Sequence, residues 1–296
     1  MKRISFHDQM AKNKRDSVLL GILVFSFLVL LVYVIGQVLV PELSIVFLIF
    51  SMVIIFVYTY SSYNYGDKVV LAATKAKLVK DGDRRYIHLI NVVEGLSIAA
   101  GIPKPKIYVI ESDDINAFAC GKDPQHSSVA VTTGLLKNLK RDEIEGVIGH
   151  ELSHIKNYDI RFATLVAVLV GLVAIISYMF LRTFRFGGRK GRDKGGLLIL
   201  VGLILAIFAP IVARLVQFAV SRKREYLADA SSVQLTRYPE GLASALEKIM
   251  KINTGKMKVS EAVSHLFFTD PSKSALDSLH ATHPPLKERI KILRSM

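Results

Sequence analysis

The apolar residues of this 296-residue chain are concentrated in four long blocks. No charged residue occurs between Val18 and Val40, Leu43 and Tyr65, Phe162 and Leu181, or Gly195 and Ala213. As a helix, each block is long enough to cross roughly 30 Å of hydrocarbon. The alternative, a buried core helix, would need a larger protein to hide a helix that has no polar face. The pattern therefore predicts four hydrophobic helices, most of them transmembrane.

These blocks divide the chain into four regions. Residues 1–66 are predicted to form an N-terminal transmembrane hairpin that is retained, because only Pro41 and Glu42 separate two long blocks and a cleavable signal peptide has a shorter one. Residues 67–160 form the first part of a compact domain. Residues 161–218 form a second hydrophobic hairpin with a basic loop, and residues 219–296 complete the domain.

The polar regions predict a mixture of helices and strands. Helical spacing runs from Asp67 to Ala100 with a break at residues 81–83, which predicts two helices. Three short runs, KIYVI, NAFAC and SSVAVT, then predict strands at 106–110, 116–120 and 127–132, with a turn at 121–126. Acidic residues after Arg141 are typical of a helix N-terminus. This order predicts an α+β domain rather than alternating βαβ units.

The charge distribution indicates a membrane orientation. The net charge is +14, and basic residues precede the first block and follow the second, so the positive-inside rule places the N-terminus and the domain in the cytoplasm. Nucleic acid is the competing partner for such a basic chain, but no recognised nucleic-acid module is present, so we expect none. The single cysteine, Cys120, excludes an intrachain disulfide and is expected to be inert.

The second hairpin conflicts with that rule. Its loop carries six basic residues between Arg182 and Lys194, so two crossings would place a basic loop outside. Either the N-terminal hairpin fixes the orientation, or the second pair of blocks is embedded shallowly or packed on the domain. The sequence does not choose between these two arrangements.

The pentad HELSH, residues 150–154, is the strongest chemical signal. An α-helix places residues four apart on one face, so His150 and His154 converge on one point. Two imidazoles at this spacing with an intervening glutamate are typical of a zinc protease, in which the histidines bind Zn²⁺ and Glu151 is the general base. One Zn²⁺ per chain is predicted.

A hydrolytic zinc site usually has three protein ligands, so one more is needed. Glu225 is the best candidate, because it lies on a segment of helical spacing with Asp229 one turn later, and Asp229 could orient a zinc-bound histidine. The alternative is that both are solvated charges that balance the basic residues before them. Asp159 is either a further carboxylate partner of a histidine or an ordinary helix-end charge. His265 and four other histidines lack ligand-like spacing and receive no role.

The chain resembles the HtpX family of membrane-bound zinc endopeptidases, which are related to the CAAX prenyl proteases. The resemblance rests on HELSH, EYLADA after the fourth block, NAFA at 116–119, VTTGLL at 131–136 and HPPLKER at 283–289. It implies a zincin-like (gluzincin) domain in which Glu225 is the third ligand. It also implies that Asn116, Ala117, Phe118 and Ala119 form an edge strand for an extended peptide, that His283 stabilises the transition state, and that Arg289 supports His283.

Together these features predict an integral-membrane zinc endopeptidase of the cell membrane, with its site facing the cytoplasm. Its expected partners are the lipid bilayer and extended polypeptides from misfolded or damaged membrane proteins, and the resemblance implies a role in quality control. A membrane-anchored metal-binding scaffold or sensor without proteolysis is the alternative, disfavoured by the intact Glu151. A transporter ranks third, because the four blocks contain no ionisable residue for a transport path.

Overall fold

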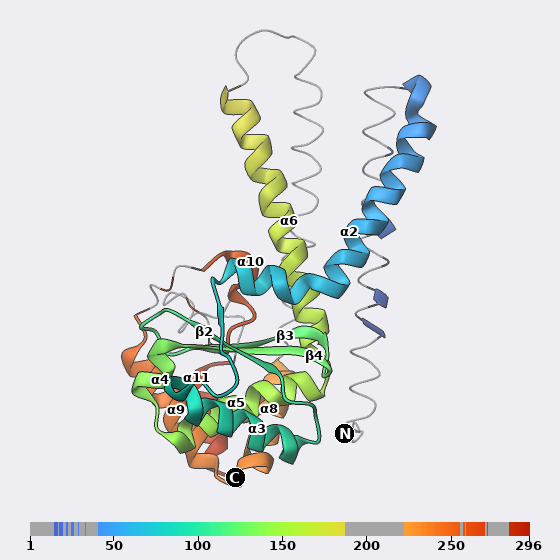
Figure 1. Ribbon diagram of the computed structural model, residues 1–296. Helices are drawn as coiled ribbons and strands as arrows, with labels where there is room; N and C mark the ends of the chain where they lie inside the picture. The colour runs from blue at the N-terminus through green and yellow to red at the C-terminus, as the bar shows by residue number, and fades with distance from the viewer. Residues whose placement is uncertain are drawn as a thin grey trace.

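The computed structural model describes residues 41–186, 222–254, 259–269 and 284–296, together with residues 257 and 271 and isolated residues between 15 and 33. It consists of an α+β domain from which two long helices project (Figure 1). These are α2 (Ser44–Ala73), preceded by the 3-10 turn η1 (Pro41–Leu43), and α6 (Asp159–Phe186). The two helices contact each other near the domain and diverge away from it (Figure 1).

A four-stranded mixed sheet separates the projecting helices from the rest of the domain. Its strands are β1 (Lys77–Leu78), β2 (Lys106–Ile110), β3 (Ala117–Asp123) and β4 (His126–Thr132), in the order β1-β2-β4-β3. β2 and β4 are parallel, whereas β3 and β4 form an antiparallel hairpin with an irregularity between Gly121 and Asp123. This order makes β3 an edge strand.

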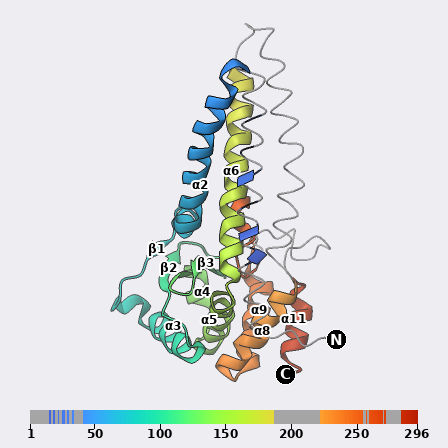
Figure 2. The same cartoon turned by 90° about the vertical axis from the view of Figure 1, so that its right-hand side faces the viewer.

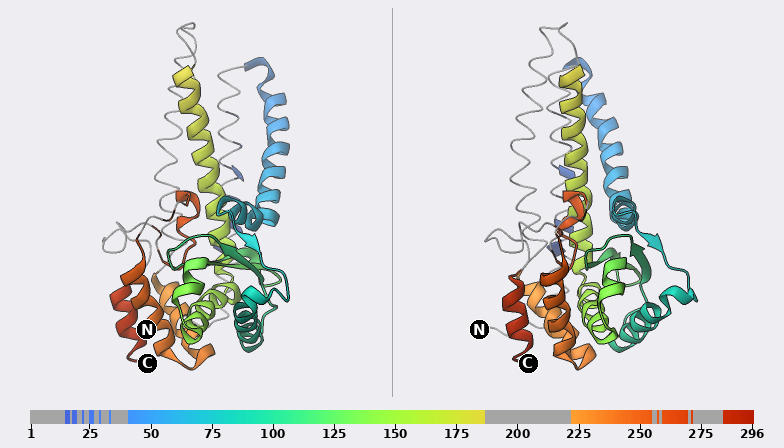
Figure 3. Two further views of the ribbon diagram at one scale, coloured as in Figure 1. Left: turned by 60° about the vertical axis from the view of Figure 1, so that its left-hand side comes forward. Right: turned by 90° about the vertical axis from the view of Figure 1, so that its left-hand side faces the viewer.

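Helices cover the face of the sheet that lies away from α2 and α6, as Figures 2 and 3 show. The central one is α5 (Arg141–Lys156), which packs against α3 (Ile87–Ala100), α8 (Arg222–Thr236) and α9 (Pro239–Ile252). α11 (Leu286–Leu293) packs on α9 and α8. Three short elements complete the domain: η2 (Arg84–Tyr86), α4 (Thr133–Asn138) and α10 (Glu261–Ser264).

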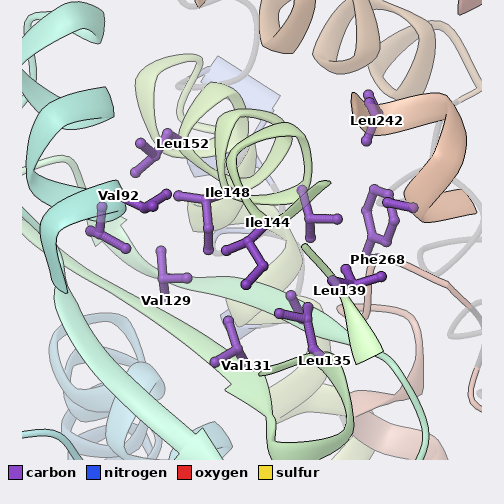
Figure 4. Close-up of a cluster of buried hydrophobic side chains, with 14 of the residues drawn as sticks. Val92, Val129, Val131, Leu135, Leu139, Ile144, Ile148, Leu152, Leu242 and Phe268 are labelled. Carbon is purple, nitrogen blue, oxygen red and sulfur yellow. The ribbon is translucent and has the colours of Figure 1, made fainter. Parts of the chain in front are cut away.

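The larger hydrophobic core lies between the sheet and α5. Ile144, Ile148 and Leu152 recur every four residues, so they form one stripe of α5 that faces Val129 and Val131 of β4 (Figure 4). A second buried cluster lies on the opposite face of the sheet. There Phe118 and Cys120 of β3 pack with Val70 of α2 and Ala167 of α6. Both faces of β3 are therefore buried, and the sheet fixes the base of the projecting helices relative to α5.

Most of the predicted elements are present, with two corrections. The three predicted strands form β2, β3 and β4, but β3 extends to Asp123, so the predicted turn at 121–126 is shorter than expected. The predicted helix beginning at Asp67 is wrong in its extent, because α2 continues through this position and ends at Ala73. Lys75, with φ of 54°, then turns the chain into β1.

The predicted membrane spans are not confirmed. α2 and α6 contain the second and third apolar blocks, whereas the fourth block and most of the first lie outside the described residues. Within the described part of the chain, no helix meets the combined criteria of length and hydropathy for a membrane span.

Two glycines test the packing of α5. A Cβ at Gly146 would lie 2.7 Å from the backbone nitrogen of Leu242, whereas a Cβ at Gly95 in α3 would meet nothing within 4 Å. We expect Gly146→Ala to force α9 away from α5 and to lower the free energy of unfolding by about 1–3 kcal/mol. Gly95→Ala, the matched control, should raise it by roughly 0.5–1 kcal/mol. Chemical denaturation of both variants measures this, and equal stabilities would contradict the packing described.

Candidate metal centre

The predicted metal ligands are brought together by the close crossing of α5 and α8. Gly149 of α5 has room for no side chain, because a Cβ there would lie 2.8 Å from the Ser232 hydroxyl oxygen. Ser232 also donates a hydrogen bond to the Gly146 carbonyl, at 2.6 Å. With the two helices this close, Glu225 of α8 reaches the face of α5 that carries His150 and His154.

The three side chains form a triangle of the size that a tetrahedral zinc ion requires. The Nε2 atoms of His150 and His154 are 3.1 Å apart, and each lies 3.6 Å from an oxygen of Glu225. Ligands at 2.0–2.1 Å in tetrahedral geometry would be about 3.4 Å from one another. Two imidazole nitrogens and a carboxylate oxygen also suit zinc chemically. The residues present therefore fit the ion, with His150, His154 and Glu225 as the group that would hold it.

Each histidine is oriented by a carboxylate on its other ring nitrogen. His150 Nδ1 lies 2.9 Å from Asp229, and His154 Nδ1 lies 3.0 Å from Asp159. Such contacts fix the tautomer and aim Nε2 at the metal position. Burial lowers the pKa of His154, but the hydrogen bond with Asp159 and the charges of the surrounding carboxylates outweigh this effect and raise the pKa to about 9. The surroundings of His154 thus favour positive charge.

Arg289 is paired directly with Asp229. Its Nε and Nη2 atoms donate to the two Asp229 oxygens at 2.8 and 2.6 Å, and the side chain is fully buried. Burial alone would raise the pKa of Asp229, but Arg289 and the hydrogen bonds from His150 and Arg289 lower it to about 2. The guanidinium also lies 4.8 Å from the centre of the Phe268 ring. The predicted supporting residue therefore acts on the carboxylate that orients His150.

The buried charged groups around the site have an excess of negative charge that a divalent cation would balance. Four buried carboxylates surround the site, against the two buried guanidinium groups of Arg224 and Arg289. With neutral histidines, this set has two excess negative charges, which an ion such as Zn²⁺ would balance. Buried charges are stable only when they are paired or coordinate metal. The four carboxylates belong to Glu151, Asp159, Glu225 and Asp229.

Glu151 lies in the same small cavity as the metal-ligand group. The cavity has a volume of ≈ 40 Å³, and Ala119 of β3 also lines it. Burial raises the pKa of Glu151, against the lowering effect of the two histidines and Arg289. A carboxylate with a raised pKa is a better proton acceptor, which suits a general base at neutral pH.

The predicted substrate strand is at the edge of the sheet, but its members have different surroundings. Ala117 and Ala119 face the α5 side, and Phe118 packs into the second cluster. The Asn116 side chain is bonded within the chain: Nδ2 donates to the Thr269 carbonyl at 2.8 Å, and Oδ1 accepts from the Thr269 amide at 3.2 Å. Asn116 thus holds residue 269 beside the strand.

Sequence reasoning missed three residues at the site. His265 lines the cavity, with Nε2 at 3.2 Å from the Ala163 carbonyl, although its spacing gave it no role. Arg224, to which the sequence assigned no role at the site, is buried and lies 3.6 Å from Asp159. Phe268 packs edge-to-face on His150 at 4.8 Å. Of these three residues, only Arg224 could have been assigned to the site from the sequence, because it directly precedes Glu225. His283 lies outside the described residues.

Comparison with known proteins identifies the family. The model of peptidase family M48 matches residues 84–296. The chain belongs to this family. A protease HtpX homolog of Dictyoglomus turgidum is 44% identical to this chain, over all of this chain and 96% of its own length. The homolog of Caldanaerobacter subterraneus subsp. tengcongensis is 42% identical over 100% of this chain and 99% of its own length. The homolog of Streptococcus uberis is 39% identical over 98% of this chain and 99% of its own length. The chain is thus a metalloprotease that resembles HtpX along its length, as predicted.

A solved structure shares the fold. The crystal structure of S. mikatae Ste24p aligns over 96% of this chain and 66% of that chain, with a TM-score of 0.51 and 20% sequence identity. At this identity the likeness concerns the fold alone. It agrees with the predicted α+β architecture.

The Asp229 carboxylate can be tested by removing its charge. Asp229→Asn would remove the carboxylate bonded to the buried Arg289, whose guanidinium would keep only the more distant contact with Glu225 at 3.9 Å, and would leave His150 less firmly oriented. We expect the free energy of unfolding to fall by about 3–5 kcal/mol and zinc affinity to fall roughly 10–100-fold. Denaturation and competition with a chelating dye measure the two effects. Glu240→Gln, which removes the carboxylate of an exposed pair with Arg294, is the control and should change neither quantity appreciably.

The same carboxylate predicts a dependence on pH. Its pKa is about 2 in the folded protein and near 3.8 when unfolded, so its contribution is fully present above about pH 4 and is lost as the pH falls towards 2. The difference corresponds to about 2 kcal/mol. Denaturation at pH 5 and at pH 3 should therefore show a smaller loss of stability in Asp229→Asn than in the unmodified protein. Parallel losses would show that Asp229 is not the titrating group.

Proposed function

We propose that this M48 protease is a zinc endopeptidase that cleaves extended segments of membrane proteins. The observation that carries the proposal is the placement of Glu151 in one cavity with His150, His154 and Glu225, beside Ala119 of the edge strand. A general base, a metal-ligand group and a backbone edge that can bind a peptide are the three parts that peptide hydrolysis needs. They meet here within a single small cavity.

Bound at this site, Zn²⁺ would polarise the scissile carbonyl and lower the pKa of a water molecule. Glu151 would take the proton of the attacking water and transfer it to the leaving nitrogen. Asp229 and Asp159 keep the two imidazoles oriented while this happens. His283 stays our candidate for a hydrogen bond to the developing oxyanion, because it lies six residues before Arg289, whose guanidinium reaches the site.

The exposed apolar side chains of α2 support the proposed membrane location. The pairs Ile45–Val46, Ile49–Phe50, Val53–Ile54 and Phe56–Val57 are each more than half exposed. Successive residues of a helix point about 100° apart, so these exposed side chains together cover about half of the circumference of α2. Soluble proteins rarely expose apolar surface on this scale. We infer that this side of α2 faces lipid and that the domain lies at the cytoplasmic face of the cell membrane.

The substrate class follows from this location. A site at the base of a membrane helix reaches the cytoplasmic segments of other membrane proteins. Pairing with a strand edge requires the substrate to be extended, which a folded segment is not. Misfolded or damaged membrane proteins satisfy both conditions, so quality control is the role we propose. A metal-binding scaffold or sensor without proteolysis is the alternative, and it predicts zinc binding without chelator-sensitive cleavage.

Replacement of Glu151 separates these two functions. Glu151→Gln keeps the shape of the cavity but removes the proton acceptor, so we expect a full zinc content and a loss of about 10²–10⁴-fold in turnover. Cleavage of unfolded casein by the purified protein, with metal analysis of the same samples, measures both. Glu225→Ala is the contrasting variant, because it should lose zinc as well as activity. Cleavage at the unmodified rate by Glu151→Gln would contradict the mechanism.

The orientation can be tested with single cysteines, because the native Cys120 is fully buried. A cysteine at Ile98, which is 76% exposed on α3, reports the side of the membrane on which the domain lies. A cysteine at Glu42, which is exposed just before α2, reports the side on which the start of α2 lies. With a membrane-impermeant maleimide on intact cells, we expect Glu42→Cys to be labelled and Ile98→Cys to be labelled only after permeabilisation. The reverse pattern would place the active site outside.

A further inference from the structure

The outer edge of β3 is formed by alternate residues. In an antiparallel strand, the amide and carbonyl of one residue point to the same neighbour, and the next residue points the other way. Asn116 points towards β4, because its carbonyl accepts a hydrogen bond from the Thr132 amide at 3.0 Å. The backbone groups of Ala117, Ala119 and Gly121 therefore face the outer edge, where a peptide could be added.

The first of these positions is already occupied by the protein itself. The Ala117 carbonyl accepts a hydrogen bond from the Phe268 amide at 2.7 Å, and the Ala117 amide donates to Asn116 Oδ1 at 3.1 Å. The same Asn116 side chain holds both backbone groups of Thr269. Residues 268–269 thus run antiparallel to the start of β3 and use the hydrogen bonds that a substrate would need there.

The third position is blocked from the other side. The Gly121 amide donates to the hydroxyl oxygen of Thr164 at 3.0 Å, and Thr164 is buried in the first turns of α6. Between the two occupied positions lies Ala119. Within the described part of the chain, no hydrogen bond to its outward amide and carbonyl is present, and Ala119 lines the cavity that contains His150 and Glu151.

The burial of Phe267 and Phe268 indicates whether a substrate could displace the Phe268 segment from β3 or whether that segment is fixed. Phe267 and Phe268 are 1% and 2% exposed. Phe267 packs edge-to-face on Phe118 at 5.0 Å between ring centres, and Phe268 lies between His150 and Arg289. Releasing this segment would expose both rings and disturb a metal ligand, whereas a substrate would return only two backbone hydrogen bonds at Ala117. The segment is therefore a permanent part of the site.

We propose that the substrate backbone is recognised at one residue only, through the amide and carbonyl of Ala119, and that Phe268 and Thr164 set the two ends of this short edge. This inference rests on the proposed peptidase function and sharpens its substrate class. A peptide then needs to be extended over only about one residue on either side of that contact. Cleavage in short exposed loops becomes possible, without the long unpaired strand that an open sheet edge would demand.

N-methylation of the substrate backbone tests the proposal on the unmodified, zinc-loaded protein. A peptide that the enzyme cleaves is prepared as a series, each member with one N-methyl group at a residue outside the scissile bond. We expect a large rise in KM, about two- to tenfold for one lost hydrogen bond, at a single position. Similar losses at two positions separated by one residue would show pairing along a longer edge and would overturn the proposal.

A pair of variants tests the Thr164 boundary. Thr164→Ala frees the Gly121 amide and space beside it, so peptides lengthened by two residues towards that end should bind about two- to tenfold more tightly than the shorter ones. Thr164→Ser retains the hydroxyl and should gain nothing from the added residues. An equal gain in both variants, or in neither, would contradict the role of Thr164 as a boundary.

The outcomes separate this inference from the proposed function. If no peptide or unfolded protein is cleaved in a chelator-sensitive manner, the proposed function fails and this inference fails with it. If cleavage occurs with two sensitive backbone positions, the protease function stands and only the one-residue edge is wrong.

Discussion

The paired contacts of Asp229 hold the metal centre together. One oxygen of this carboxylate lies 2.9 Å from His150 Nδ1, and both accept hydrogen bonds from Arg289. The three residues belong to α5, α8 and α11, so a single carboxylate joins elements that are far apart in sequence. Its negative charge is stabilised in the interior by the guanidinium bonded to it, and that guanidinium is stabilised in turn by this carboxylate and by Glu225, 3.9 Å away. The orientation of the first metal ligand thus depends on the docking of the last helix.

The second ligand depends on a different part of the chain. His154 is oriented by Asp159, which is the first residue of α6, after a sharp turn at Tyr158 with φ of 61°. Arg224 of α8 lies 3.6 Å from the same carboxylate. The two histidines are therefore held by carboxylates from two different helices, α8 and α6. Glu225 closes the group between them, so the site forms only when α6 and α8 are both in place on α5.

The sequence predicted the parts of this arrangement that follow from local spacing. Four-residue spacing on one helix face indicated that His150 and His154 act together, and three short runs rich in apolar residues indicated the strands. The pairing of Glu225 and Asp229 followed from their separation by one helical turn. None of these patterns contains information about distant contacts. The buried Arg224 looked the same as its exposed neighbours. His265 showed no ligand-like spacing in the sequence, because its place depends on where α10 packs against α6.

The role of Asn116 shows a further limit of local patterns. The resemblance to HtpX placed it in the substrate strand, and it does lie directly before β3. Its side chain, however, binds Thr269, more than 150 residues later. An edge strand is recognised in sequence by its composition, but what covers its edge depends on tertiary structure. Which positions stay open to a peptide can be judged only from the backbone hydrogen bonds that neighbouring segments make.

The base of α6 links these features to the projecting helices. Within its first three turns, Asp159 orients a metal ligand, the Ala163 carbonyl meets His265, Thr164 bonds to the edge strand, and Ala167 packs in the cluster that includes Val70 of α2. A shift of α6 along its axis by even one turn would break all four contacts together. The helix that we propose to lie in the membrane therefore also lines the cavity of the candidate metal centre. This continuity gives a physical reason for the division that the sequence predicts: α6 begins in the first half with the orienting carboxylate Asp159 and continues into the predicted insertion, where Thr164 forms one end of the proposed substrate edge.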